Sequence, residues 1–296
     1  MKVLVFGGSG LLGSHVVDAL TKEGHETAIF DIRISPYLQK GQEMIIGDIL
    51  DRESVEKAAR GRDAVYNFAG IADIGEAYTK PIETVENNIG GTTIILEACR
   101  KHAVKRFVFA STIYVYSDKG GFYRCSKQAA ELYTEEYARH FGLDYTVLRY
   151  GTVYGPRADS RNSMYCYLKQ AIENEKIVCS GTGDEIREYI HVKDAARLSV
   201  SILSDEYRNQ HVIITGHHSM RFEDMLHMVR EILGNRVEIE FTGAIDESHY
   251  NITPYSFVPK IGRKLVDHCY VDMGQGLLEC INEIYNSKPG GEKSVR

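Results

Sequence analysis

The sequence predicts an α/β fold built on a doubly wound parallel sheet, and three observations support this. Short apolar runs alternate with helical patterns through the first half of the chain, as expected when crossover helices join parallel strands. The first run, residues 2–6, ends at glycines spaced GxxGxxG, and a helical pattern follows at once. Polar residues then recur at the ends of successive predicted strands, where ligands bind in such sheets.

The glycine-rich turn after the first strand predicts a dinucleotide-binding site. Gly7 and Gly10 permit close approach of the backbone, and Gly13 lets the helix pack on the strand, so a pyrophosphate can bind at the helix N-terminus. The next strand, residues 27–30, is followed by Asp31, 18 residues beyond Gly13, where a carboxylate accepts from ribose hydroxyls. Arg33 could meet an additional phosphate, but repulsion by Asp31 favours NAD over NADP. The alternative is a structural turn in another α/β protein.

The remaining elements follow in chain order. Strands are expected at residues 43–46, 63–68, 106–110 and 144–149, and helices at residues 51–60, 81–102 and 123–141. Beyond residue 150 we expect a helix at 160–174, a strand at 187–192 that returns to the sheet, a helix at 194–203 and a strand at 211–215. Segments 221–233, 237–241 and 272–286 predict a smaller α+β cap. The sheet domain is therefore expected over residues 1–150 with 187–215, and the cap over 151–186 and 216–290.

Composition and charge exclude several classes of function. The 296 residues carry a net charge of −6 without a basic block, so nucleic acid is not an expected partner. No apolar run approaches the roughly 18 residues of a membrane span, and the chain opens with a strand rather than a signal peptide. The six cysteines are scattered without a CxxC pair, which indicates free thiols and no metal site. We therefore expect a cytoplasmic protein.

Tyr123 and Lys127 stand four residues apart on one face of a predicted helix. A free tyrosine has a pKa of about 10, and a nearby ammonium lowers that pKa, so the pair can act as a general acid/base. Thr112 ends the preceding strand, so its hydroxyl can point into the same crevice. Such a set suits removal of a proton from a secondary alcohol while NAD takes the hydride. The alternative for a lone Tyr–Lys pair is an ordinary surface contact.

These residues together resemble the extended short-chain dehydrogenase/reductase family, in its branch of NAD-dependent nucleotide-sugar epimerases and dehydratases. The resemblance covers residues 1 to about 286 and implies a Rossmann sheet with a substrate-binding cap. Besides the glycine turn and the Tyr–Lys pair, the matching motifs are Gly47-Asp48-Ile49, Asn67-Phe68-Ala69-Gly70, Asn88-Ile89-Gly90-Gly91-Thr92, Leu148 to Arg157, and Arg187 to Asp194.

The resemblance implies a role for each matching residue. The implied catalytic residues are Thr112, Tyr123 and Lys127. The implied substrate-binding residues are Thr112, Thr152 and Arg187, with the guanidinium of Arg187 on the diphosphate; a structural bridge between the two lobes is the alternative for Arg187. The implied NAD-binding residues are Gly7, Gly10, Leu11, Leu12, Gly13, Asp31, Asp48, Ile49, Ala69, Gly70, Asn88 and Lys127.

The resemblance also implies an activity. Dehydratases and decarboxylases of this family carry an acid just after the catalytic Thr or Ser, where this chain has Ile113 and Tyr114, and the stretch from Thr112 to Tyr123 is short. The implied function is a nucleotide-sugar 4-epimerase working through a transient 4-keto intermediate. A nucleotide-sugar 4-dehydrogenase or ketoreductase, a 4,6-dehydratase and a non-catalytic NAD-binding regulator remain alternatives. The implied partners are a nucleotide-diphosphate sugar and a second copy of the chain, because residues 81–102 and 123–141 resemble the helices through which family members form homodimers. The alternative for the aromatic and aliphatic positions of these helices is ordinary core contacts.

Overall fold

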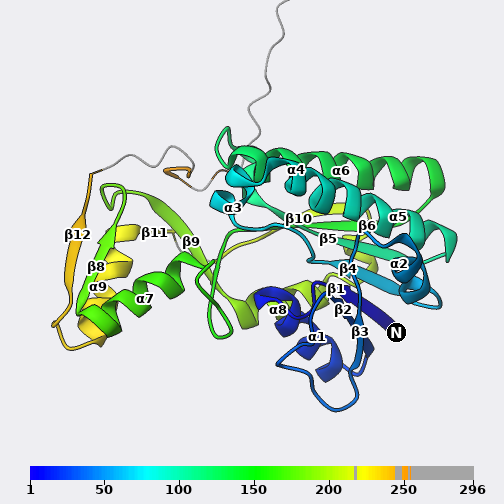
Figure 1. Ribbon diagram of the computed structural model, residues 1–296, viewed down its shortest axis with the longest axis horizontal. Coiled ribbons are helices and arrows are strands. Elements are labelled where there is room, and N and C mark those ends of the chain that lie inside the picture. Colours follow the sequence, from blue (N-terminus) through cyan, green and yellow to red (C-terminus); the bar gives the residue numbers. More distant parts are fainter. Residues whose placement is uncertain (217–218, 244–248, 253, 255–296) are drawn as a thin grey trace, which may run out of the picture. The chain divides into compact units, whose positions relative to one another are not determined.

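The fold is described by a computed structural model that covers residues 1–216, 219–243, 249–252 and 254. Its largest element is a seven-stranded sheet with the order β10-β6-β5-β4-β1-β2-β3 (Figure 1). All six strand pairings in this sheet are parallel. Its strands are β1 (Lys2–Phe6), β2 (Glu26–Asp31), β3 (Glu43–Ile46), β4 (Ala64–Asn67), β5 (Arg106–Thr112), β6 (Tyr145–Tyr150) and β10 (Gln210–Ile214).

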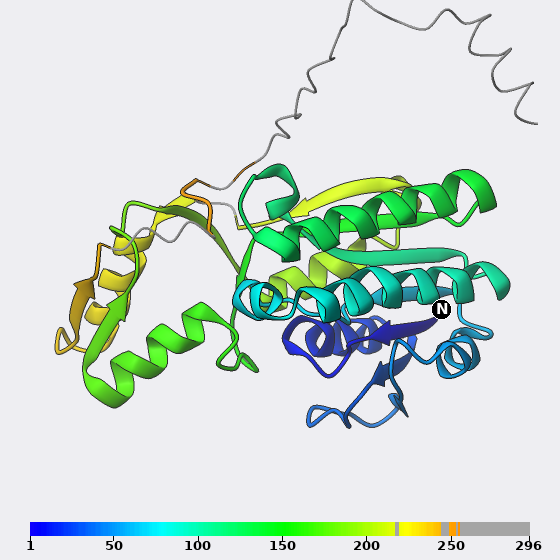
Figure 2. The ribbon, with the colours of Figure 1, turned by 45° about the horizontal axis from the view of Figure 1, so that its top comes forward.

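Helices cover both faces of this sheet, which confirms the predicted doubly wound fold. On one face lie α1 (Leu11–Lys22) and α8 (Val192–Ser201), which pack against each other. On the other lie α2 (Arg52–Ala59), α5 (Thr92–Lys101) and α6 (Gly121–Phe141) (Figure 1). The helical stretch that ends in α5 runs side by side with α6 (Figure 2). None of the described helices has the length and apolar character that a membrane span requires.

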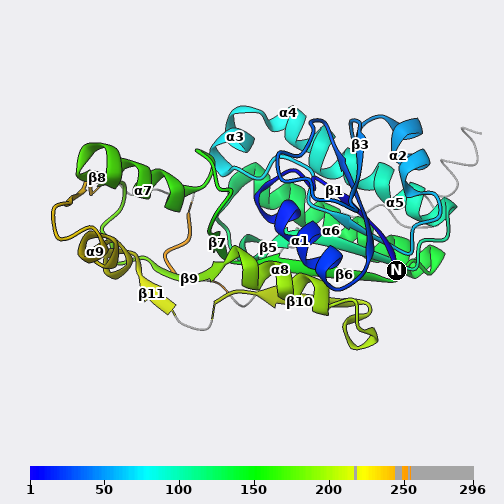
Figure 3. The ribbon, with the colours of Figure 1, turned by 90° about the horizontal axis from the view of Figure 1, so that it is seen from below.

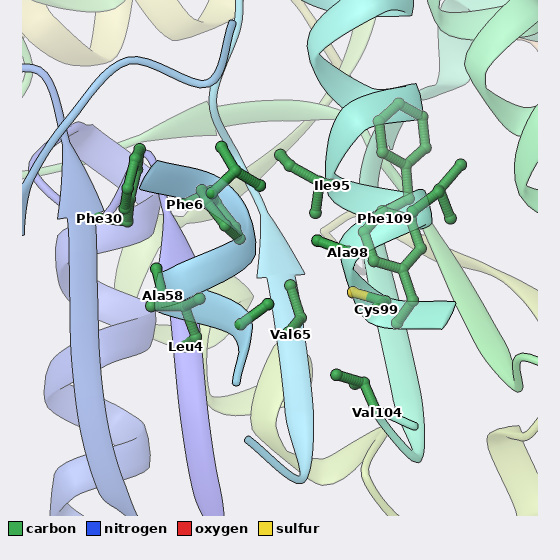
Figure 4. Close-up of a cluster of buried hydrophobic side chains, with 14 of the residues drawn as sticks. Leu4, Phe6, Phe30, Ala58, Val65, Ile95, Ala98, Cys99, Val104 and Phe109 are labelled. Carbon is green, nitrogen blue, oxygen red and sulfur yellow. The ribbon is translucent and has the colours of Figure 1, made fainter. Parts of the chain in front are cut away.

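Burial on both faces explains why the strands are almost continuously apolar. Side chains alternate along β1, so Leu4 and Phe6 join the core under α2 and α5, whereas Val3 and Val5 join the core under α1 and α8. In Figure 4, side chains from several strands meet side chains from the helices above them. The labelled members of this core are Leu4, Phe6, Phe30, Ala58, Val65, Ile95, Ala98, Cys99, Val104 and Phe109.

The helix expected at residues 81–102 is present as one continuous helical stretch from residue 81 to residue 101, with a π-helical segment in its middle. A short α3 (Ile74–Thr79) precedes α4 (Pro81–Thr84), which continues into a π-helical turn (Val85–Gly91) and then α5. Two adjacent glycines, Gly90 and Gly91, lie in the π-helical turn, where their low helix propensity weakens the regular α-helix. A Cβ at Gly91 would lie 2.5 Å from Cδ1 of Ile49, so the Ile49 side chain, on the loop after β3, would have to move to admit a larger residue there.

The prediction that the strand at residues 187–192 joins the main sheet is wrong. β9 (Ile186–His191) pairs with β7 (Thr152–Tyr154) and β11 (Ser219–Arg221) in a separate three-stranded sheet. The edge beside β6 is occupied by β10, so the chain returns to the main sheet with α8 and β10 rather than with β9. The boundaries of the two domains stay a prediction.

A third core lies among the elements expected for the cap. β8 (Lys176–Cys179) pairs with β12 (Glu238–Phe241), and α7 (Ser163–Asn174) and α9 (Phe222–Ile232) bury their apolar sides against this small sheet. Figure 3 shows α7, β8 and α9 grouped together. The helix expected at residues 272–286 lies outside the described residues.

Candidate active site

Two clefts open at the carboxyl ends of the parallel strands. The sheet cleft has a volume of about 790 Å³. The cap cleft, of about 780 Å³, extends from the end of β5 to the elements of the cap. The sheet cleft is lined by most of the expected NAD-binding residues: Gly7, Gly10, Leu11, Leu12, Gly13, Asp31, Asp48, Ile49, Ala69, Gly70 and Lys127. The cap cleft is lined by the expected substrate-binding residues Thr112, Thr152 and Arg187.

The two clefts meet at a place that we call the junction. It consists of the described residues that line both clefts, namely Ala72, Asp73, Thr112, Tyr123, Gly151, Val153, Arg161 and Asn162. Thr112 and Tyr123 are among them. Two of the three expected catalytic residues therefore lie at the junction, where they can contact a ligand in the sheet cleft and a ligand in the cap cleft.

The glycine turn forms a cradle that a side chain would fill. Gly7 has a φ of +74°, a conformation that favours glycine, and the Cβ of any other residue there would lie 2.6 Å from the Ala69 nitrogen. At Gly13 a Cβ would lie 2.3 Å from the carbonyl oxygen of Gly7. Asp31 stabilises the turn, since its Oδ2 accepts a hydrogen bond from the Ser9 N–H at 3.0 Å. The cradle at the positive end of α1, with Asp31 beside it, fits the diphosphate and ribose of a dinucleotide.

Asn88 is the exception among the expected NAD-binding residues, because it does not line the sheet cleft. It is 1% exposed. Its Oδ1 accepts from the N–H of Ile71 at 2.8 Å, and its Nδ2 donates to the carbonyl of Ile71 at 2.9 Å and to the hydroxyl of Ser126 at 2.8 Å. Asn88 therefore connects the loop after Gly70 to α6 and acts as a positioning residue.

Tyr123 and Lys127 lie in the first two turns of α6, beside the end of β5. The Lys127 ammonium lies 5.8 Å from the centroid of the Tyr123 ring and donates to the carbonyl of Ala110 at 2.8 Å. Lys127 is 6% exposed. The hydroxyl of Thr112 lies close enough to the Tyr123 phenol to favour its deprotonated form. The structure thus brings all three expected catalytic residues together at the end of one strand.

The expected lowering of the Tyr123 pKa is wrong for this structure. Burial raises the pKa of Tyr123 to about 12, against the opposing effect of the Thr112 hydroxyl. Burial also lowers the pKa of Lys127 to about 8, although the negative charge of Glu131 opposes that change. The cost of burying a charge outweighs the attraction between the two groups, so in this structure the phenol is protonated at neutral pH.

A buried ion pair below the junction was missed by the sequence reasoning. Glu131, four residues after Lys127 on α6, accepts from Arg149 at the end of β6 and from the hydroxyl of Ser111. Arg149 also donates to the phenol of Tyr116 at 2.5 Å. The i, i+4 spacing from Lys127 placed Glu131 on the same helix face, and this spacing was the signal that could have identified it.

An aromatic cluster borders the cap cleft. Tyr114, in the short 3₁₀-helix Ile113–Tyr116, meets Tyr123 edge-on at 6.4 Å and lies 4.7 Å from Tyr250 between ring centroids. Its phenol forms a hydrogen bond with His249. The guanidinium of Arg187 lies 4.6 Å from the centroid of the Tyr250 ring. No local pattern predicts a role for Tyr114, because its contacts with His249 and Tyr250 join chain segments more than 130 residues apart.

No group of three or more His, Cys, Asp or Glu side chains in the described part of the chain is arranged to hold a metal ion. The four cysteines that the structure describes, Cys99, Cys125, Cys166 and Cys179, are free thiols.

The NAD dependent epimerase/dehydratase family has a profile that matches residues 3–215. Among solved structures, the UDP-glucose 4-epimerase of Thermotoga maritima with UDP-glucose is similar to this chain at a TM-score of 0.80 and 26% identity, over 87% of this chain and 90% of that one. The UDP-glucuronic acid 4-epimerase of Bacillus cereus, in complex with UDP-glucuronic acid and NAD, is similar at a TM-score of 0.79 and 25% identity, over 88% of this chain and 95% of that one.

Curated relatives carry more than one activity. The UDP-glucose 4-epimerase of Streptomyces lividans is 28% identical over 80% of this chain and 82% of its own length. The UDP-N-acetyl-α-D-glucosaminuronate decarboxylase of Bacillus cytotoxicus is 29% identical over 73% of this chain and 74% of its own length.

Proposed function

The chain belongs to the NAD dependent epimerase/dehydratase family, and from that premise we propose that it is a nucleotide-sugar 4-epimerase working through a transient 4-keto sugar. The observation that carries the proposal is the junction, where Thr112 and Tyr123 line both clefts. A cofactor in the sheet cleft and a sugar in the cap cleft would meet beside the Tyr123 phenol. Such a meeting point suits transfer of hydride between the two.

The sheet cleft would hold NAD through residues already described. The glycine turn and the N-terminus of α1 would bind the pyrophosphate, and the carboxylate of Asp31 would accept from the adenosine ribose hydroxyls. Lys127 would lie beside the nicotinamide ribose, and Asp48, Ile49, Ala69 and Gly70 would border the remainder of the dinucleotide. When bound, NAD takes a hydride from a secondary alcohol carbon and can return it to the resulting ketone.

The chain's own residues would move the proton and orient the sugar. In its phenolate form Tyr123 would take the proton of the sugar 4-hydroxyl, becoming the phenol, and would later return that proton, while the hydroxyl of Thr112 would hold the sugar oxygen in reach. Lys127 keeps a pKa of about 8, so it remains largely an ammonium at neutral pH and would favour the phenolate. Arg187 would bind the substrate diphosphate, for which a planar guanidinium is suited.

The residues after Thr112 favour epimerisation over elimination or decarboxylation. Ile113 is 1% exposed and apolar, and Tyr114 presents a phenol rather than a carboxyl group. The carboxylate at the junction, Asp73, already accepts the Glu76 N–H at the start of α3 at 2.6 Å. Return of the hydride to the opposite face of the same carbon needs no additional acid, which supports an epimerase.

We also propose that the protein works in the cytoplasm as a homodimer formed through the segment 81–101 and α6. Exposed apolar side chains on these helices, including Ile82, Val85, Leu132 and Tyr133, support this assembly. Light scattering in solution tests it, and a monomer at micromolar concentration would reject it.

The activity is tested by proton NMR of the purified protein with UDP-, GDP-, CDP- and dTDP-sugars and no added NAD. We expect a new anomeric signal from a product of unchanged mass. A keto product that forms only with stoichiometric NAD would instead identify a dehydrogenase. A product lighter by one water would identify a dehydratase, and absence of any conversion by protein that carries NAD would favour a non-catalytic regulator.

A further inference from the structure

We propose that the sugar of the substrate is uncharged, a neutral hexose or N-acetylhexosamine rather than a hexuronic acid, an inference that rests on the proposed 4-epimerase function. The two solved structures reported above contain UDP-glucose and UDP-glucuronic acid respectively. These sugars differ at C6, where one has a hydroxymethyl group and the other a carboxylate. The charged side chains around the junction would favour the neutral hydroxymethyl group over the carboxylate.

The charged residues of the junction, within the described chain, are Asp73 and Arg161. Arg161 is already bound by another carboxylate. Its Nε donates to the two oxygens of Asp159 at 3.0 and 3.2 Å, and its Nη2 donates to Oδ2 of Asp159 at 2.6 Å. This bidentate pair occupies the Nε–Nη2 edge of the guanidinium, and the charge of Asp159 offsets the charge of Arg161.

The charge that remains at the junction is negative. Glu76, beside Asp73, is paired with Lys80 at 2.9 Å, just as Asp159 is paired with Arg161. With these two pairs neutral, the carboxylate of Asp73 leaves a net charge of −1. Both Glu76 and Asp73 help to raise the pKa of Arg161, which places the three groups within electrostatic reach of one another.

The nearest lysine, Lys127, lines the sheet cleft and not the cap cleft, and the proposed function commits it to the nicotinamide ribose and to Tyr123. Among the described residues that line the cap cleft there is no lysine, and the arginine besides Arg161 is Arg187. Arg187 lies on β9 against the Tyr250 ring, and the proposed function commits it to the diphosphate. The end of the cap cleft near the junction instead presents hydroxyl groups from Thr112, Tyr114, Tyr123 and Thr152, which are suitable partners for sugar hydroxyls.

A uronate would therefore lose water without gaining a cation that is free of another carboxylate or of the diphosphate. Desolvation of a carboxylate without such a partner is costly. In addition, a like charge held roughly 6 Å away in a water-rich cleft weakens binding by about threefold. Together these effects predict that UDP-glucose binds at least about tenfold more tightly than UDP-glucuronate, and that added salt reduces the difference.

The test measures the dissociation constants of UDP-glucose and UDP-glucuronate by calorimetry with the NAD-loaded protein at low and high salt. The nucleotide is the same in both ligands, so its contribution cancels in the ratio. The informative variant is Asp73→Asn, which removes the charge but keeps a residue suited to cap α3. The matched control is Asp51→Asn, because Asp51 caps α2 in the same manner and does not line either cleft.

We expect the wild-type ratio to favour UDP-glucose, Asp73→Asn to reduce that ratio by about threefold, and Asp51→Asn to leave it unchanged. Equal or tighter binding of UDP-glucuronate by the wild type would overturn the inference, as would a ratio that Asp73→Asn does not alter. Turnover is measured separately. Selective binding of UDP-glucose without epimerisation would reject the proposed function and leave the charge preference standing.

Discussion

The guanidinium of Arg149 donates two parallel hydrogen bonds to the carboxylate of Glu131, from Nη2 to Oε2 at 2.6 Å and from Nε to Oε1 at 3.1 Å. Glu131 is 5% exposed and also accepts from the hydroxyl of Ser111, the residue before Thr112. The pair therefore connects α6, β5 and β6 directly below the junction. It holds the helix that carries Tyr123 and Lys127 against the strand that carries Thr112.

Replacing Glu131 by Gln is expected to destabilise the protein by about 3 kcal/mol, because it leaves the largely buried guanidinium of Arg149 without a compensating charge. The free energy of unfolding in urea measures this loss. The matched control is Glu136→Gln on the same helix. Glu136 pairs with Arg139 at the exposed surface, so its replacement is expected to cost less than about 0.5 kcal/mol. Equal losses in the two variants would contradict a special role for the buried pair.

Replacing Tyr123 by Phe is expected to lower the rate of epimerisation by a factor of about 10³, since the variant lacks the oxygen that would exchange the proton. Because the ring is kept, the melting temperature and the amount of NAD that copurifies with the protein should change little. The control is Tyr133→Phe, which removes a phenol oxygen from an exposed position on α6. Full activity in Tyr123→Phe would reject the proposed mechanism.

The main sheet could be predicted from the sequence because its signals are local. Each strand is a short apolar run, and each run is followed by glycine or a polar residue, as at Gly7 and Asp31. The location of β9 could not be predicted in this way. Residues 186–191 have the composition of a strand, but whether they join the main sheet depends on which strand occupies the edge beside β6. That edge is taken by β10, and no local pattern reports this.

In the candidate site too, features set by local sequence could be predicted, whereas features set by distant residues could not. Spacing placed Tyr123 and Lys127 on one helix face, and the structure brings them to the end of β5 with Thr112. The pKa of each group could not be predicted, because it depends on burial by residues distant in sequence. Asn88 is part of a motif that resembles the family, yet its hydrogen bonds to Ile71 and Ser126 show that its side chain faces the protein interior. A motif identifies a position but does not reveal the direction of its side chain.

Replacing Gly13 by Ala is expected to destabilise the protein by about 2 kcal/mol and to reduce the NAD that copurifies with it. The added methyl group would lie 2.3 Å from the carbonyl oxygen of Gly7, so the turn must shift. The control is Gly90→Ala, where the nearest atom outside the adjoining chain is 3.9 Å away, and this change should be neutral or slightly stabilising. Chromatography of the nucleotide released on denaturation measures the NAD, and retention of NAD at the wild-type level in Gly13→Ala would contradict the assigned role of the turn.

The buried ammonium of Lys127 is expected to make stability depend on pH in a direction that can be measured. Burial lowers its pKa to about 8 in the folded protein, whereas an unfolded chain keeps the ordinary value of about 10.4. Between these values the unfolded state binds more protons, so the free energy of unfolding rises with pH. Relative to Lys127→Met, which has no charge to lose, the wild type should gain about 2 kcal/mol from pH 7 to pH 9.5. Taking the difference between the two proteins cancels the titration of all other groups. Urea unfolding of both proteins without bound nucleotide gives this difference, and a constant difference across that range would mean that Lys127 keeps an ordinary pKa in the folded state.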